Sequence, residues 1–190
     1  MNPQIDITHV VLTTPRLTLR PWRETDLEDF YEYARVDGVG QMAGWSPHKD
    51  MEESRRILQH FIEEKHVFAL EFEGKAIGSL GIEAYKEEQY PELAALRGRE
   101  IGYVLSKAYW GRGLMPEAVA AVKRYLFDTV GLDFILVGHF DWNRQSRRVI
   151  EKNGFRYIKT VPFTTRFDTQ ETALDYILYR EGEKNAADGV

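Results

Sequence analysis

A strand, a glycine-bracketed turn and a helix follow one another over residues 99–118, and this segment constrains the fold more than any other. Residues 100–105 have the composition of a strand, Gly111 and Gly113 bracket the turn, and Pro116 lies in the first turn of the helix. Such a connection directs unpaired backbone N–H groups and the positive end of a helix dipole to one place. The two glycines permit positive φ and leave no side chain between the backbone and a ligand. The sequence therefore predicts an anion site, most often one for a phosphate, at this turn.

Composition narrows the class of protein further. The 190 residues include no cysteine, which excludes disulfides, thiolate nucleophiles and zinc–thiolate sites. The N-terminus has no basic segment followed by an apolar run, and no window approaches the roughly 18 apolar residues of a membrane helix. We therefore expect a cytoplasmic protein. The net charge of -5 argues against bulk nucleic-acid binding and is compatible with a cationic acceptor.

Hydrophobic periodicity predicts strands and helices that alternate along the chain. Seven segments are expected to be strands: 17–20, 67–72, 76–82, 100–105, 134–139, 155–161 and 174–179. Helices are expected over 26–33, 51–65 and 116–129, and between Asn143 and Gly154. Thr25 and Asn143 are placed to cap the first and last of these helices, and a polar loop is expected over 86–99. This order predicts a mixed α/β sheet with helices on both faces.

Two segments match one family of enzymes. The turn Trp110-Gly111-Arg112-Gly113-Leu114-Met115-Pro116-Glu117-Ala118 resembles the acetyl-CoA-binding motif of the Gcn5-related N-acetyltransferases (GNAT). The run over 143–155 resembles the second conserved block of that superfamily, and residues 14–21 resemble the first strand of its ribosomal-protein N-terminal acetyltransferase branch. One departure is Ala108, where the superfamily often has Gln or Arg. The resemblance implies a single N-acetyltransferase domain over 10–181, with about seven strands in a splayed sheet, and the polar composition of 182–190 predicts a flexible tail.

The resemblance also implies that acetyl-CoA is the co-substrate, and the residue pattern leads us to expect no metal. The pantetheine arm would enter between the strands over 101–105 and 134–139, and the diphosphate would lie on the N–H groups of roughly residues 110–114. The residues that the resemblance assigns to acetyl-CoA binding are Ile101, Gly102, Tyr103, Val104, Leu105, Trp110, Gly111, Arg112, Gly113, Leu114, Met115, Asn143, Ser146, Arg147 and Lys152. For Arg147 and Lys152 the alternative is a solvated helix surface, and for Asn143 it is a helix cap alone.

Acetyl transfer to an amine requires a base, because the acceptor arrives largely as an ammonium ion. Glu100 begins the strand along which the thioester would lie, and burial beside an apolar strand would raise the pKa of its carboxyl into a useful range. We expect Glu100 to be the general base, with Glu83 as the second candidate. The alternative for Glu100 is an edge ion pair with Arg97 or Arg99. The resemblance suggests Ser146 as the proton donor to the CoA sulfur. The alternative is that Ser146 only caps the helix or is solvated.

The acceptor and the partners remain open at this point. The resemblance implies N-acetylation of a primary amine, either a protein N-terminal α-amine or a small amine. Four acidic residues would favour a cation in either case: Glu83, Glu87, Glu88 and Glu92. The alternative function is a non-catalytic acyl-CoA-binding or sensing module. The five histidines show no metal-ligand spacing, and an exposed sheet edge near the C-terminus would suit a homodimer, which is common in this branch.

Overall fold

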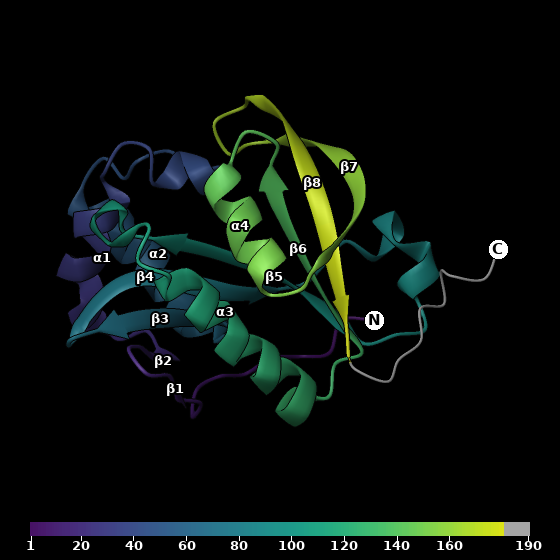
Figure 1. The fold of residues 1–190 in the computed structure, drawn as a ribbon. Coiled ribbons are helices and arrows are strands. Elements are labelled where there is room, and N and C mark those ends of the chain that lie inside the picture. The colour runs from purple at the N-terminus through teal and green to yellow at the C-terminus, as the bar shows by residue number, and fades with distance from the viewer. Residues whose placement is uncertain (181–190) are drawn as a thin grey trace.

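The computed structural model describes residues 1–180 and contains one eight-stranded sheet (Figure 1). The strands lie in the order β1-β2-β3-β4-β5-β6-β8-β7. They are β1 (Leu12–Thr13), β2 (Thr18–Pro21), β3 (Val67–Phe72), β4 (Lys75–Glu83), β5 (Gly98–Leu105), β6 (Phe134–Phe140), β7 (Arg156–Thr164) and β8 (Gln170–Tyr179). The α-helices are α1 (Leu27–Ala34), α2 (Met51–Glu64), α3 (Leu114–Arg124) and α4 (Arg144–Lys152). None of the helices in residues 1–180 combines the length and the apolar character needed to cross a membrane.

Helices cover both faces of the sheet. Successive residues of each strand point to opposite sides, so both faces carry apolar side chains that the helices bury. On β3, Phe68 and Leu70 pack in one apolar core with α3, whereas Val67 and Ala69 pack in a second core with α1 and α2. Helix α4 joins the first core through Ile150, so α3 and α4 share the face that is turned toward the viewer in Figure 1. The mixed α/β architecture predicted from the sequence is confirmed.

Three predicted details differ from the structure. The eighth strand, β1, consists of two residues paired with β2, which is too short to give a periodic pattern. The helix predicted over 116–129 begins two residues earlier, at Leu114, and passes into a π-helix over Tyr125–Val130. The predicted loop over 86–99 contains two short 3-10 turns, and β5 begins before its end. The tail predicted over 182–190 lies outside the described residues.

The prediction that Thr25 caps the first helix is wrong. Residues Glu24–Asp26 form a 3-10 turn, and α1 begins only after it. The Asp26 carboxylate accepts a hydrogen bond from the backbone N–H of Arg23 at 2.8 Å and pairs with the buried Arg20 at 2.8 Å. The turn is therefore held by Asp26, and the helix starts at Leu27, one residue later than predicted.

Strands β5 and β6 separate part-way along their length. Their parallel pairing ends at Ile101 and Val137, whereas β5 continues to Leu105 and β6 to Phe140. Beyond that point β5 stays paired with β4, and β6 stays paired with β8, so the sheet divides into two parts. The predicted splay is confirmed. The backbone groups of β5 that face the gap have no strand partner and are free for another one.

Candidate functional site

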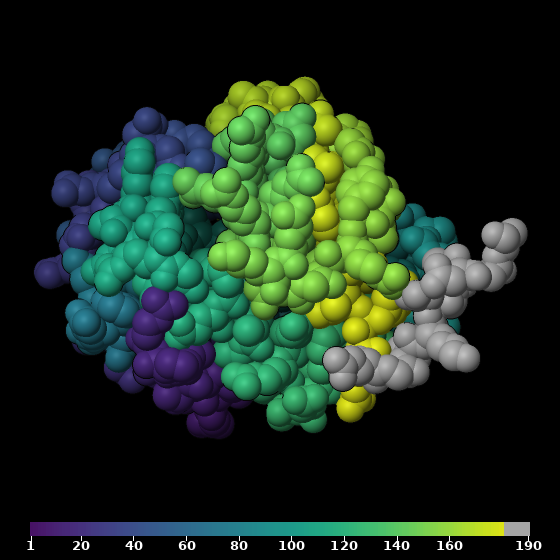
Figure 2. All heavy atoms as spheres, viewed as in Figure 1, coloured from purple at the N-terminus to yellow at the C-terminus, as the bar shows by residue number. Residues whose placement is uncertain are grey.

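A cavity of about 580 Å³ passes through the gap between β5 and β6. Its walls come from the separated part of β5, the glycine turn before α3, the first turns of α4, and the 3-10 turn Gly40–Ala43 between α1 and α2. The molecular surface is visibly hollowed between the glycine turn and α4 (Figure 2). The volume lies within the range of sites for small molecules and cofactors.

The glycine turn presents a run of unpaired donors. Within residues 1–180, the backbone N–H groups from Gly111 to Met115 donate to no protein atom, whereas the N–H of Trp110 bonds to the carbonyl oxygen of Lys107 at 3.3 Å. Gly111 and Gly113 have φ values of +74° and +75°, which favour glycine, and a Cβ added to Gly111 would meet no atom within 4 Å. The donors adjoin the N-terminus of the 11-residue α3, whose dipole adds to their preference for an anion. The free run is shifted by one residue from the predicted 110–114.

Most residues that the sequence assigned to acetyl-CoA binding line this cavity. They are Ile101, Gly102, Tyr103, Val104, Leu105, Trp110, Gly111, Gly113, Leu114, Met115, Asn143, Ser146 and Lys152. Two are not among the lining residues. The guanidinium of Arg112 lies over the rings of Phe72 and Tyr109, 5.0 and 5.2 Å from their centroids. Arg147 pairs with Glu151 at 2.8 Å on the exposed side of α4.

Sequence reasoning missed Arg148, which lines the cavity together with Lys152. Helix α4 turns one face to the cavity, and the lining residues on it are spaced as helix neighbours: Gln145, Ser146, Arg148, Val149 and Lys152. The spacing of four residues between Arg148 and Lys152 is the signal that could have identified this face. It places two cations on the wall opposite the glycine turn.

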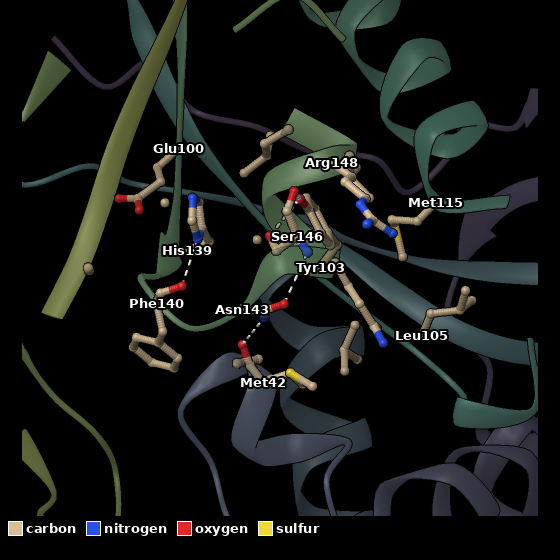
Figure 3. A pocket seen from close by; sticks show the side chains of 18 of the residues that line it. Met42, Glu100, Tyr103, Leu105, Met115, His139, Phe140, Asn143, Ser146 and Arg148 are labelled. Carbon is tan, nitrogen blue, oxygen red and sulfur yellow. Dashed lines mark hydrogen bonds between the residues drawn. The ribbon is translucent and has the colours of Figure 1, made fainter. Parts of the chain in front are cut away.

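Asn143, Ser146 and Tyr103 form a hydrogen-bonded chain across the middle of the cavity (Figure 3). The Ser146 N–H donates to Asn143 Oδ1 at 3.0 Å, so the predicted cap is confirmed. The Asn143 Nδ2 donates to the carbonyl oxygen of Met42 at 3.2 Å, which ties α4 to the loop between α1 and α2. The Tyr103 and Ser146 hydroxyls lie 2.9 Å apart, and burial raises the pKa of the Tyr103 hydroxyl. The Tyr103 hydroxyl therefore stays protonated, and either hydroxyl of the pair can donate.

Glu100 is a partly buried carboxylate on the cavity wall. Burial raises the pKa of its carboxyl to about 7, and the carboxylates of Asp175 and Glu83 add to the increase. The exposed Lys86 opposes the increase but does not cancel it. A carboxyl with this pKa exchanges its proton near neutral pH, as a general base must.

The ion pair of Glu100 with Arg97 or Arg99, which was the alternative to a general base, does not form in the structure. Arg99 donates to the carbonyl oxygen of Pro3, and Arg97 donates to that of Val130, so neither arginine pairs with Glu100. Glu83 is half exposed and pairs with His66 at 2.9 Å. Among the described residues, none of the four acidic side chains predicted to favour a cation lines the cavity, and its carboxylates are Glu100 and Asp175.

Asp175 is a site residue that the sequence did not single out. It lies on β8 opposite Gly138 of β6 and accepts a hydrogen bond from the Tyr90 hydroxyl at 2.5 Å. Burial raises the pKa of its carboxyl. A Cβ added to Gly138 would lie 3.0 Å from Asp175 Oδ1, so the glycine leaves room for this side chain. The available signal was an aspartate within the otherwise apolar run over 173–179.

The comparisons with known proteins agree with this geometry. The sequence profile of the family described as Acetyltransferase (GNAT) domain matches residues 16–156, which include β5, the glycine turn and α4. The chain belongs to this family. The predicted membership is therefore confirmed, and no group of three or more His, Asp or Glu side chains in residues 1–180 of this GNAT domain could hold a metal ion.

Solved structures show the same fold. The acetyltransferase (GNAT family) from Bacillus anthracis superposes with a TM-score of 0.77 at 21% identity, over 90% of this chain and 98% of that chain. The RimL ribosomal alpha-N-protein acetyltransferase in complex with coenzyme A superposes with a TM-score of 0.75 at 16% identity, over 92% of this chain and 100% of that chain. The probable N-acetyltransferase YjcK of Bacillus subtilis (strain 168) is 46% identical over 61 residues, which are 32% of this chain. That match spans 34% of the relative, about a third of its length.

Proposed function

We propose that this protein is an acetyl-CoA-dependent N-acetyltransferase that moves an acetyl group directly to a primary amine. The observation that carries the proposal is the run of unpaired N–H groups from Gly111 to Met115 beside the gap between β5 and β6. Each hydrogen bond to a charged acceptor contributes about 1.5–3 kcal/mol, so several of them together can anchor a diphosphate. Arg148 and Lys152 add positive charge on the facing wall.

The separated part of β5 is suited to an extended arm such as pantetheine. Its backbone groups lack a strand partner on the gap side, and a Cβ added to Gly102 would meet no atom within 4 Å. A ligand that lies there as an added strand would satisfy these groups. Acetyl-CoA, when bound, would supply the acetyl group as an activated thioester.

The residues around the gap have the properties that the transfer requires. Glu100 would take the proton of the acceptor ammonium, directly or through water, since its pKa of about 7 lies near the operating pH. The amine nitrogen would then form its bond to the acetyl carbon as the carbon–sulfur bond breaks. The leaving sulfur would take its proton from the hydroxyl pair of Tyr103 and Ser146. The nitrogen would give up its second proton to that hydroxyl pair, directly or through water, so the products are the amide, the free CoA thiol and the proton held by Glu100.

Two measurements on the full chain test the proposal. Calorimetry with acetyl-CoA should detect association, and release of the free CoA thiol should depend on an added amine. Association without amine-dependent release from a broad panel of amines would instead support an acyl-CoA-sensing module. Absence of any heat of association would overturn both functions.

A further inference from the structure

Two carboxylates, Glu100 and Asp175, lie in adjacent rows on one face of the sheet at the cavity wall. Residues paired on neighbouring strands point their side chains to the same face. Glu100 pairs with Leu136, and two residues further along β6, Gly138 pairs with Asp175. Glu100 and Asp175 therefore face the same side of the sheet, and the Tyr90 hydroxyl donates to Asp175 there. A cation placed between the two carboxylates would meet two acidic groups, with Lys86 near Glu100 and Lys159 paired with Asp175 as the neighbouring cations.

The next row on the same face is apolar. Phe140 pairs with Ala173, and Ala173 pairs with Val161, so these side chains lie beside one another. Phe163 continues the row along β7, and its ring centroid lies 5.4 Å from that of Phe140. All four line the cavity. Figure 3 shows Phe140 on the Glu100 side of the cavity, away from Arg148.

Two loops hold this apolar row in place. The backbone N–H of Arg166, in the loop between β7 and β8, donates to the carbonyl oxygen of Gly44 at 2.9 Å. A Cβ added to Gly44 would lie 3.3 Å from the rings of both Phe140 and Phe163, so the loop after α1 packs directly against these rings. The neighbouring Met42 and Ala43 also line the cavity. The apolar end is therefore bounded, and it suits a compact group.

We propose that the acceptor is a primary amine with a compact aromatic or branched apolar group close to the nitrogen. This inference rests on the proposed N-acetyltransferase function and specifies its acceptor. The ammonium lies against Glu100 and Asp175, and the apolar group packs against Phe140, Val161 and Phe163. Two residues along a strand span about 7 Å, so the apolar group begins within two or three bonds of the nitrogen.

Polyamines fit this arrangement poorly, because their second ammonium group would lie on the apolar row and lose its hydration without a partner. An arylalkylamine and a polypeptide whose first residue is phenylalanine both carry a primary amine with an aromatic ring a few bonds from the nitrogen. The arrangement of charge and apolar surface therefore defines the acceptor class, and the two sources are separated by experiment.

The test compares kcat/KM at saturating acetyl-CoA for 2-phenylethylamine, ethylamine and putrescine, and for tetrapeptides that begin with Phe or Ala. The expected preference for the aromatic member of either set is about 10- to 100-fold, as for burial of one Phe side chain. If the acceptor is a small free amine, kcat/KM should be higher for 2-phenylethylamine than for the Phe peptide. If the acceptor is a polypeptide, the order should be reversed. Equal rates within both sets, or a preference for putrescine, would overturn the inference and leave N-acetyl transfer standing. Failure to acetylate any amine would overturn the proposed function, and the inference with it.

A matched pair of variants locates the preference on the apolar row. Phe163→Ala should lower the ratio of kcat/KM for 2-phenylethylamine over ethylamine about 10-fold. Ile158→Ala is the control, because Ile158 is exposed to a similar degree (37% against 41%) and is not on the cavity wall. Both side chains are exposed, so both variants should fold. An unchanged ratio in Phe163→Ala, or an equal loss in the control, would overturn the assignment of this row.

Discussion

Replacing Glu100 by glutamine should make the enzyme slower and, above pH 7, more stable. The substitution keeps the shape of the side chain and removes the charge. Glu100 interacts with the acidic Asp175 and Glu83, and Lys86 is the cation that opposes them. Loss of a general base lowers turnover by about 10²- to 10⁴-fold.

The gain in stability follows from the pKa of the Glu100 carboxyl. A value of about 7 in the folded protein, against 4.5 ordinarily, means that ionised Glu100 destabilises the fold by about 3 kcal/mol. Below pH 4.5 the carboxyl is protonated in both the folded and the unfolded chain, so the two proteins should be equally stable. As the pH rises from 4.5 to 7 the wild type loses stability relative to the variant, and above pH 7 the full difference is present. For a chain of this length the difference corresponds to roughly 6–12 °C in Tm.

Thermal unfolding at pH 4, 5.5, 7 and 8.5 checks the predicted change in stability. Measurements of kcat/KM for one amine, over the pH range in which the protein is folded, check the predicted change in rate. The acid limb of the wild-type profile should rise tenfold per pH unit and level off near pH 7, and the variant should lack this limb. Glu83→Gln is the matched control, because Glu83 is half exposed, pairs with His66 and should leave the limb in place. A Tm difference that does not change with pH, or a Glu100→Gln variant that keeps more than half of the wild-type rate at pH 7, would refute the reasoning.

Two further substitutions test the glycine turn and the cap of α4. Gly111→Ala should weaken acetyl-CoA binding about 5- to 30-fold in calorimetry, because φ is +74° and the added methyl group would enter open space at a residue that lines the cavity. Gly74→Ala, with a φ of +80° and equally open surroundings, should lose similar stability without losing affinity, and equal affinity losses would contradict the assignment. Asn143→Ala should lower stability by about 1 kcal/mol in chemical denaturation and kcat/KM by more than 10-fold, because it breaks the bonds to Ser146 and Met42. Asp50→Ala removes the corresponding cap of α2, and a similar loss of activity there would show that the effect is general destabilisation.

The features that could be predicted from the sequence are those with a local cause. The free N–H run at 111–115 lies within one residue of its prediction, because two glycines and the start of a helix determine it without help from the rest of the chain. The strands and helices follow from periodicity in the same way. The sequence names Arg147 and misses Arg148, because the exact phase of α4 depends on how Ile150 enters the core, which is a tertiary contact.

The local sequence marks Asp175 only as an aspartate within an apolar run, and its place in the site depends on the order of strands in the sheet. Strand β8 lies between β6 and β7, so a residue near the end of the chain faces Gly138 and comes close to Glu100. Pairing across such sequence distances leaves no local pattern. The homodimer suggested by the sheet edge stays a prediction, and β7, the last strand in the sheet order, is the edge to examine.

The environment of Glu100 is itself an argument for its role. Arg99 lies one residue and Arg97 three residues before it in sequence, and an ion pair with either would have lowered the pKa of its carboxyl. Instead, both arginines donate to backbone carbonyl oxygens, and Glu100 faces a second carboxylate, Asp175. A fold selected for stability alone would not keep two acidic groups together at this cost, whereas a base that works near neutral pH requires such a raised pKa. Glu100 also lies one residue before Ile101, where the pairing of β5 with β6 ends, so a ligand in the gap and an acceptor on the Glu100 face would meet beside this carboxylate.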